Sequence, residues 1–420
     1  MYPRTHRSAP GNPLAIGLAL ALGLAACGEA PTSPPAAPPA PPVARVQAEV
    51  SPLVTATCPS GTESASGAMP GSGALYLICI PPAAAWNGSV VVYAHGYVNP
   101  FDPLAIQDDA VGGIPVSRIV TGLGFAFATT SYRDNGLIIV EGVRDLKQLV
   151  DKFRQVSGGG HIPGLTLAVG ASEGALVAVL ATERYPRLFD GTLALCGPLG
   201  DFAQQLDYFD DFRLLFDWFF PGVIPGSIVA VPDAVVQAWL LPIGAPGSLQ
   251  AAVLGALAAD PAATAQLLAA AGLDVPPDPA VVGETVLRLL AYNVVGTGNA
   301  VLELGGQPYD NIGRVYPPPV DNTLVPRFSV DQNVRSHLRA KYETDGSLTV
   351  PVVTMHNLFD PVVPYWHEAL YAARVQQAGA SAFLTRIPGA TLASPFGHCT
   401  FTLAEVGSAF ALLLSQVGAP

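Results

Sequence analysis

The stretch Leu165-Thr-Leu-Ala-Val-Gly-Ala-Ser-Glu-Gly-Ala-Leu176 joins a short apolar run to a segment of helix-forming residues. Its centre is a Gly-x-Ser-x-Gly turn, with Ser172 between Gly170 and Gly174, and this pattern occurs once in the chain. A serine hydroxyl protrudes from a sharp strand-to-helix turn only where its neighbours carry little side chain, because the backbone there is strained and closely packed. The stretch therefore predicts a strand, an exposed serine and a helix, the form of a nucleophile elbow.

Strands and helices alternate on both sides of this turn. Short apolar runs predict strands at 74–80, 89–95, 124–130, 165–169, 190–196, 350–356 and 382–387. Helical periodicity or composition predicts helices at 135–156, 173–184, 366–378 and 400–414. Such an alternation is typical of an α/β fold with a mainly parallel sheet.

The alternation stops between residues 201 and 349. Phenylalanines recur at helical spacing at the start of this segment, at positions 202, 209, 212, 216, 219 and 220. Asp260-Pro261 and Asp278-Pro279 have the form of helix N-caps followed by a first-turn proline. The segment is therefore expected to be a mostly helical insertion, and we interpret its aromatic stripe as the insertion's own core rather than as the wall of a substrate site.

The N-terminus has the features of an export signal. Two arginines precede an apolar run that ends in Leu-Ala-Ala-Cys27, which predicts a signal peptide over residues 1–26. These last four residues resemble a bacterial lipobox, in which the cysteine is acylated, and a Pro- and Ala-rich tether follows over 27–55. The mature protein is thus expected to be lipid-anchored at the cell envelope through Cys27, at the outer membrane of a Gram-negative cell. Secretion after an ordinary signal peptide is the alternative.

Composition argues against nucleic-acid binding and against a membrane-spanning helix. The net charge is −12 and no basic patch is visible, which argues against nucleic acid. Apolar residues make up 50% of the chain, yet no apolar run reaches the roughly 18 to 20 residues that a membrane-spanning helix needs. The expected membrane contact is therefore the lipid anchor alone.

Two residues that follow later strands complete a catalytic set with Ser172. Asp360 comes just after the strand at 350–356, and His398 lies between the last strand and the last helix. A serine hydroxyl becomes a nucleophile when a neutral imidazole takes its proton and a carboxylate on the far ring nitrogen fixes the tautomer. Ser172, Asp360 and His398 are therefore the candidates for a catalytic triad, in the chain order nucleophile, acid, histidine.

Such a site also needs donors for a developing oxyanion. The candidates are the backbone N–H of Glu173, just after the serine, and that of Tyr97 in the sequence Ala-His95-Gly-Tyr97. His95, His356 and His367 are interpreted as structural groups that brace loops. No candidate partner in the sequence suggests a catalytic role for the histidines at positions 161 and 337.

These motifs resemble those of the α/β-hydrolase superfamily. The resemblance rests on the Gly-x-Ser172-x-Gly turn, His95-Gly96, Asp360 with the following Val363-Pro364, and Gly397-His398. It implies an eight-stranded core over residues 56–200 and 350–420, with the insertion at 201–349 following the sixth strand and acting as a lid. It also implies a carboxylic ester hydrolase that forms an acyl-enzyme on Ser172.

The expected substrate is a small-molecule or polymeric ester with a substantial apolar part. Residues 202–241 offer many aromatic and aliphatic side chains, and each substrate methylene buried against such walls contributes about 0.8 kcal/mol. Short acyl esters are then expected to be poorer substrates. A serine peptidase of the same fold and a non-catalytic surface binding module are the two alternatives.

Cysteine usage fits an exported chain. Besides Cys27 there are four cysteines, Cys58, Cys79, Cys196 and Cys399, and an even number can pair in an oxidising compartment. Three pairings are possible. Cys58 with Cys79 is the local choice, which leaves Cys196 with Cys399 beside His398. No metal-ligand or nucleotide-binding motif is present in the sequence, so no metal or cofactor is expected.

Overall fold

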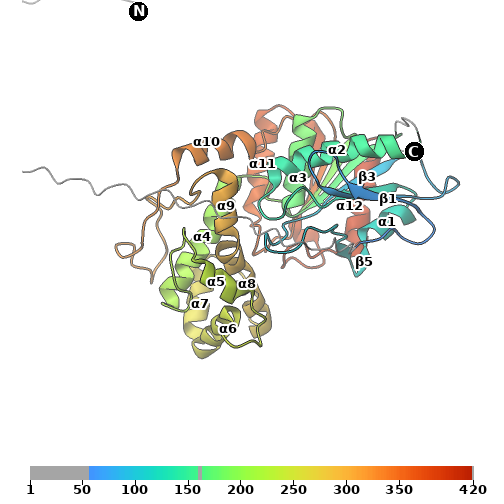
Figure 1. Cartoon of the computed structure of the whole chain (residues 1–420). Helices are drawn as coiled ribbons and strands as arrows, with labels where there is room; N and C mark the ends of the chain where they lie inside the picture. Colours follow the sequence, from blue (N-terminus) through green and yellow to red (C-terminus); the bar gives the residue numbers. More distant parts are fainter. Residues whose placement is uncertain (1–55, 159–162, 419–420) are drawn as a thin grey trace, which may run out of the picture. The chain divides into compact units, whose positions relative to one another are not determined.

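The computed structural model describes residues 56–158 and 163–418 (Figure 1). The expected signal peptide, the tether and the lipidation site Cys27 lie outside the described residues, as does His161. Among the described residues no single helix is long and apolar enough to cross a membrane. Two consecutive helices of the insertion meet the criterion only as a pair, and they are bent by 103° at their junction.

An eight-stranded sheet forms the core. In chain order its strands are β1 (Glu63–Ala68), β2 (Leu75–Ile80), β3 (Val90–Ala94), β6 (Ala126–Thr130), β7 (Thr166–Ala171), β8 (Gly191–Leu195), β9 (Val352–Met355) and β10 (Leu384–Ile387). Their order in space is β1-β2-β6-β3-β7-β8-β9-β10, and only the pairs that include β2 are antiparallel. Strands β3, β6 and β8 are buried at every residue, which explains why they appear in the sequence as short apolar runs.

Helices cover both faces of this sheet (Figure 1). The helices α2 (Ile139–Val156), α3 (Glu173–Arg184) and α11 (Trp366–Gln377) pack on one face, and α1 (Val116–Gly122) and α12 (Leu403–Gln416) pack on the other. A short hairpin precedes α1; its two strands, β4 (Ala110–Val111) and β5 (Ile114–Pro115), have two residues each. Short 3₁₀ turns flank β10 at Ser381–Phe383 and Gly389–Thr391.

The insertion lies between β8 and β9 and is helical. Its helices are α4 (Phe202–Phe219), α5 (Asp233–Leu240), α6 (Leu249–Ala259), α7 (Pro261–Ala270), α8 (Pro279–Val294), α9 (Gly296–Leu304) and α10 (Gln332–Lys341). The side chains of Asp201, Asp260 and Asp278 accept backbone N–H groups and so cap α4, α7 and α8. Helices α4 to α8 enclose a hydrophobic core of their own, whereas α9 and α10 pack against the core of the sheet domain.

The sheet order and the position of the insertion are those of the α/β-hydrolase fold. Strand β8 is the sixth strand of the large sheet in chain order, so the insertion follows the strand predicted from the sequence. The predicted fold is confirmed. Strand β7 lies between β3 and β8, which brings the residue that follows it to the middle of the carboxyl edge of the sheet.

Candidate active site

Ser172 occupies a strained backbone position between β7 and α3. Its φ angle is 56° and its ψ angle is −127°, a combination that residues with a Cβ rarely adopt. A Cβ at Gly170 would collide with the backbone of Gly174, and a Cβ at Gly174 would collide with the carbonyl of Ala94. The two glycines therefore permit the close approach that exposes the serine, as the motif predicts.

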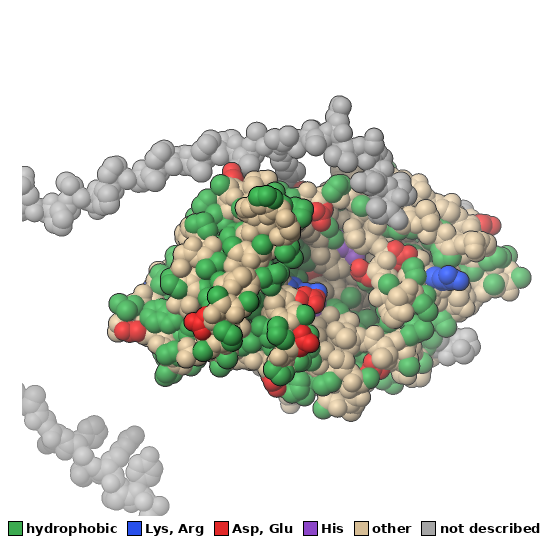
Figure 2. Space-filling model, turned by 90° about the horizontal axis from the view of Figure 1, so that it is seen from below, with side chains coloured by type: hydrophobic (Ala, Val, Ile, Leu, Met, Phe, Trp, Pro, Cys, Tyr) green, Lys and Arg blue, Asp and Glu red, His purple; other side chains and the backbone are tan. Residues whose placement is uncertain are grey.

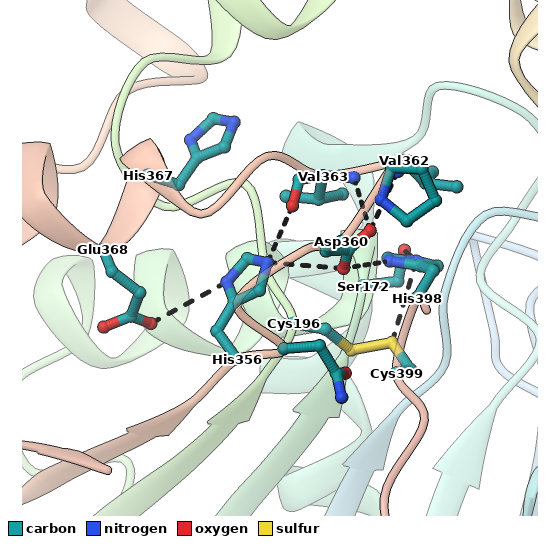
Figure 3. Close-up of polar contacts among 12 residues, drawn as sticks. Ser172, Cys196, His356, Asp360, Val362, Val363, His367, Glu368, His398 and Cys399 are labelled. Atoms are coloured by element: carbon teal, nitrogen blue, oxygen red, sulfur yellow. Dashed lines mark hydrogen bonds and ion pairs between the residues drawn. A yellow bond between two sulfur atoms is a disulfide. The ribbon is translucent and has the colours of Figure 1, made fainter. Parts of the chain in front are cut away.

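The structure brings Ser172, His398 and Asp360 together although they are far apart in the sequence (Figure 3). His398 Nε2 lies 2.8 Å from Ser172 Oγ, and His398 Nδ1 lies 2.7 Å from Asp360 Oδ2. Because Nδ1 faces a carboxylate it carries the proton, which leaves Nε2 free to accept the serine proton. This is the geometry of a nucleophile, a general base and an orienting acid.

Asp360 is a buried carboxylate with four hydrogen-bonding neighbours. Its Oδ1 accepts the backbone N–H groups of Val362 and Val363 at 2.8 and 3.0 Å, and its Oδ2 faces His398 and His356. Burial raises the pKa of Asp360, but attraction to His398 and the hydrogen bonds from His356 and His398 outweigh burial and lower this pKa to about 2. Asp360 is therefore ionised at neutral pH.

A second buried histidine, His356, contacts the same carboxylate (Figure 3). His356 Nε2 lies 3.3 Å from Asp360 Oδ2 and 2.8 Å from the carbonyl oxygen of Val363. Its Nδ1 lies 3.9 Å from Glu368, which accepts a hydrogen bond from Arg386 at 2.8 Å. Burial lowers the pKa of His356, but its hydrogen bond to Asp360 outweighs burial and the net shift is upward.

Sequence reasoning gave His356 only a loop-bracing role. The signal that points to more is its place four residues before Asp360, directly after β9.

The two other histidines near the site do hold backbone segments. His367 accepts the N–H of Gly200 at 2.9 Å and pairs through Nε2 with Gln205 at 2.8 Å, and Gln205 donates to the carbonyl of Val362 at 2.9 Å. This chain of contacts ties α4 to the loop that carries the acid. His95 Nδ1 lies 2.7 Å from the carbonyl oxygen of the next residue, so it braces the loop after β3.

The predicted oxyanion donors flank the serine. A Cβ placed on Gly96 would lie 3.2 Å from Ser172 Cβ, so the loop that leads to Tyr97 passes directly over the nucleophile. In the described part of the chain the backbone N–H groups of Tyr97 and Glu173 donate to no other group. Both are thus free to donate to an oxygen that develops negative charge beside Ser172.

The Glu173 side chain points away from solvent into the protein. Its Oε1 accepts the N–H of Ile138 at 3.2 Å, and burial raises its pKa to about 8 in spite of this hydrogen bond. Nearby, burial raises the pKa of Asp210 to about 7, although Asn293 donates to it at 2.5 Å. At pH 7 these carboxyl groups are largely or partly neutral.

Both disulfides expected from the sequence are present. Cys58 pairs with Cys79 on β2, and Cys196, directly after β8, pairs with Cys399. Cys399 Sγ lies 3.7 Å from His398 Nε2 (Figure 3). Although both sulfur atoms and His398 lie within 4.8 Å of one another, a disulfide offers no thiolate to a metal ion.

Two cavities meet at Ser172. One cavity, lined largely by residues of α4, α8 and α9, is called here the insertion-side cavity and has a volume of about 70 Å³. The other, lined largely by residues of β7, β8, α1 and α12, is called the core-side cavity and has a volume of about 410 Å³. Ser172, Tyr97 and Tyr292 line both. Figure 2 shows a hollow near the middle of one face of the molecule, bordered by hydrophobic and acidic side chains, with a histidine visible inside it.

The aromatic stripe of α4 has a divided role. Phe202 and Phe209 line the insertion-side cavity, whereas Phe216 and Phe219 line neither cavity. Phe216 is fully buried in the insertion's own core and Phe219 packs against that core. The interpretation of the stripe as the insertion's own core therefore holds for Phe209, Phe216 and Phe219, although Phe209 also forms a cavity wall. Phe202 instead packs in the core of the sheet domain and lines the same cavity.

The fold is the α/β-hydrolase fold, and its site has the arrangement of a Ser-His-Asp triad. No protein-family model and no curated protein sequence matches this chain. Solved structures similar to it include an esterase from Pyrococcus furiosus, with a TM-score of 0.43 and 12% identity over 87% of this chain and 97% of that one. An esterase from Aspergillus oryzae has a TM-score of 0.44 and 15% identity over 81% of this chain and 73% of that one.

An acylaminoacyl peptidase from Pyrococcus horikoshii is also similar in structure, with a TM-score of 0.43 and 10% identity. This likeness covers 85% of the present chain but only 42% of the peptidase. The sheet order and the elbow, rather than these likenesses, define the fold of the present chain.

Proposed function

We propose that the protein is a carboxylic ester hydrolase that forms an acyl-enzyme on Ser172. The observation that carries this proposal is the unbroken hydrogen-bond chain from Ser172 through His398 to Asp360, at a point where two cavities meet. The nucleophile, its base and its orienting acid are already at hydrogen-bonding distance, so binding of the substrate needs no rearrangement of the triad.

Each group has a defined part in the reaction. Ser172 Oγ attacks the ester carbonyl while its proton passes to His398 Nε2, and Asp360 stabilises the resulting imidazolium. The carbonyl oxygen, now negatively charged, accepts the backbone N–H groups of Tyr97 and Glu173. His398 then protonates the departing alcohol, and water repeats the sequence to release the acid.

A serine peptidase is the second candidate, because two carboxyl groups, Glu173 and Asp210, line the insertion-side cavity. An exopeptidase that holds a substrate ammonium group needs a charged carboxylate there. Both carboxyl groups already accept hydrogen bonds inside the protein, Glu173 from the N–H of Ile138 and Asp210 from Asn293. Burial also raises their pKa to about 8 and about 7, which disfavours a charged carboxylate in this cavity. Ester hydrolysis is therefore the better supported activity.

Parallel assays separate these functions. The purified protein and its Ser172→Ala variant are assayed with p-nitrophenyl esters and with aminoacyl p-nitroanilides of matched acyl groups. We expect ester hydrolysis that depends on Ser172. The ratio of the ester rate to the anilide rate with the enzyme should exceed the same ratio for the uncatalysed reactions. Anilide turnover that equals ester turnover supports the peptidase instead, and no turnover of either supports the binding module.

We also propose that the mature protein is exported and lipid-anchored through Cys27. The signal-like N-terminus motivates this proposal. The two disulfides support export, because disulfides persist in oxidising compartments.

A further inference from the structure

We propose that the substrate is an ester of a short acyl group and a large apolar alcohol. The acyl group occupies the insertion-side cavity, and the alcohol occupies the core-side cavity between the sheet and helices α1 and α12. This inference rests on the proposed ester hydrolysis and assigns the two halves of the substrate to the two cavities.

The position of His398 decides which cavity receives the alcohol. In acylation the Ser172 Oγ–carbon bond forms, the bond from that carbon to the alcohol oxygen breaks, and the serine proton passes through His398 Nε2 to the alcohol oxygen. In deacylation a water molecule enters at the same place, gives one proton to His398 Nε2 and bonds to the acyl carbon. The bond from that carbon to Ser172 Oγ then breaks, Oγ takes the proton from His398, and the carboxylic acid leaves. The leaving alcohol must therefore lie on the His398 side of Ser172.

His398 belongs to one cavity only. His398 and its neighbour Cys399 line the core-side cavity and are absent from the walls of the insertion-side cavity. Glu173, which carries one of the two proposed oxyanion donors, lines only the insertion-side cavity, whereas Ser172 and Tyr97 line both cavities. The acyl group stays bonded to Ser172 at the oxyanion site after the alcohol has left. It therefore belongs in the insertion-side cavity.

The two volumes set the sizes of the two groups. At about 70 Å³ the insertion-side cavity is about half the size of an apolar cavity of about 150 Å³ that takes up benzene, so it suits a short acyl group. At about 410 Å³ the core-side cavity falls within the range of roughly 300 to 1,000 Å³ that is usual for sites that bury a whole small molecule. The alcohol is therefore the larger part of the substrate.

The walls of the core-side cavity are mostly apolar. Val169 and Leu195 come from strands β7 and β8, Ile119 comes from α1, and Val406 and Phe410 come from α12. The wall also carries a polar pair, in which the Tyr93 hydroxyl donates to Asp109 at 2.5 Å. His95 and Gln107 add further polar atoms to the wall, but apolar side chains predominate, so the cavity favours a hydrocarbon-rich alcohol, aromatic or aliphatic, rather than a sugar.

This division reverses the expectation drawn from composition, under which short acyl esters are the poorer substrates. The experiment measures kcat/KM for two series of unactivated esters. In the first series the alcohol lengthens, from ethyl to butyl to octyl acetate. In the second the acyl group lengthens, from ethyl acetate to ethyl butyrate to ethyl octanoate. The alkyl alcohols have similar leaving-group acidity, so the first series reports binding of the alcohol. Each methylene buried in the transition state is worth at most about fourfold.

We expect kcat/KM to rise at least tenfold from ethyl to octyl acetate and to fall at least tenfold from ethyl acetate to ethyl octanoate. A rise with acyl length, or no dependence on the alcohol, overturns the assignment of the cavities. Absence of all ester hydrolysis, together with absence of labelling by a fluorophosphonate, instead overturns the proposed function on which the assignment rests.

Two pairs of glycine variants test the cavities separately. Gly407 on α12 lines the core-side cavity and Gly255 on α6 lines neither cavity, and a Cβ meets no atom within 4 Å at either position. Gly407→Leu should lower kcat/KM for octyl acetate at least fivefold more than it lowers kcat/KM for ethyl acetate, whereas Gly255→Leu should change neither. Equal effects of Gly407→Leu on both esters contradict the assignment.

The second pair lies on one helix, α9. Gly296 lines the insertion-side cavity, where an added Cβ would lie 3.6 Å from the Tyr97 hydroxyl, and Gly298 faces open space. Gly296→Ala should lower the ratio of butyrate to acetate hydrolysis at least threefold, and Gly298→Ala should leave this ratio unchanged. A ratio that is unaffected by Gly296→Ala places the acyl group elsewhere and overturns the proposal.

Discussion

Three residues with left-handed backbone angles meet at the site, and none of them is glycine. The φ angles are 56° at Ser172, 49° at Cys196 and 56° at Cys399. Such angles are costly for residues with a Cβ and persist only where the surrounding structure enforces them. At Ser172 the close packing of the elbow enforces the angle, and a disulfide joins the other two residues. The backbone itself therefore fixes the positions of the nucleophile and the histidine loop.

Replacing the triad residues should separate their roles. Ser172→Ala should lower kcat by at least about 10⁴-fold while the unfolding midpoint stays within a few degrees, because the change removes the nucleophile and little volume. Asp360→Asn should retain more activity than His398→Ala, since a misoriented imidazole still accepts a proton at times. Steady-state kinetics and thermal unfolding of the three variants check this, and near-normal hydrolysis by Ser172→Ala would rule out the triad.

His356 is expected to position and partly neutralise Asp360. In its protonated form it offsets part of the charge of Asp360, and its other ring nitrogen faces Glu368, which is paired with Arg386. Replacement by glutamine should leave His398 facing a less compensated carboxylate, which stabilises the imidazolium. The acid limb of the kcat/KM profile should then move to higher pH by about half a unit or more. A lower plateau with an unmoved acid limb would mean that His356 only holds the loop.

Glu173 should make the folded state less stable as the pH rises. Its pKa is about 8 in the folded protein and about 4.3 when unfolded, so between these values the folded state binds the extra proton. The stabilisation of the folded state that this proton provides is complete below about pH 4 and is lost as the pH rises through about 8. Over this range the free energy of unfolding should fall by roughly 1 kcal/mol per pH unit. Urea unfolding of the wild type and Glu173→Gln at pH 5 and pH 8 tests this. Equal losses in both proteins would remove Glu173 as the cause.

At the scale of elements, the sequence predicts the buried parts of the sheet well. All seven predicted strands are present, as β2, β3, β6, β7, β8, β9 and β10. All but β10 are mainly apolar and buried, whereas β10 is half-buried and contains Thr385 and Arg386. The edge strand β1 was not predicted, since it consists of small and polar residues that are mostly exposed. The helix α1 was also missed, because it has only seven residues and no side-chain cap.

The site was predicted to different depths. The triad follows from strand ends and chain order, which are local features of the sequence. The cavities depend on how far α1 and α12 stand from the sheet, and no local pattern encodes this distance. For the same reason the sequence did not separate Phe202 and Phe209, which line a cavity, from Phe216, which the insertion buries.

The disulfide between Cys196 and Cys399 links the end of β8 to the loop before α12. Replacing both cysteines by serine should lower kcat/KM about tenfold or more while the secondary structure remains, because the change frees the His398 loop without opening the sheet. The pair Cys58 and Cys79 on β2 is the matched control, and its removal should reduce stability more than activity. Circular dichroism and kinetics of both double variants decide this. Unchanged activity without the first disulfide would contradict its anchoring role.

At the scale of the whole molecule, the insertion is joined to the catalytic loop as well as to the sheet. Tyr208 on α4 donates to the carbonyl of Pro361 at 2.6 Å, and Gln205 on the same helix donates to Val362. Both acceptors immediately follow Asp360. The insertion thus supports the acid and contributes walls to the smaller cavity, which makes substrate choice a property of the insertion and the core together.

Lipidation of Cys27 should make the mature protein partition with membranes. Gly28 follows the cysteine, rather than the aspartate that retains some lipoproteins at the inner membrane, so in a Gram-negative cell we expect the outer membrane. Mass spectrometry of the mature N-terminus should find an acylated cysteine, and Cys27→Ser should release the protein from the membrane fraction. An unmodified N-terminus at another residue would contradict the anchor.

The central claim is that Ser172 is a nucleophile activated by His398. Its most direct test is labelling of the purified protein with a fluorophosphonate, followed by peptide mapping. We predict one label, on Ser172, that abolishes ester hydrolysis in proportion to its incorporation and is absent from the Ser172→Ala and His398→Ala variants. Labelling at another residue, or full ester hydrolysis in protein that is completely labelled at Ser172, would contradict the claim.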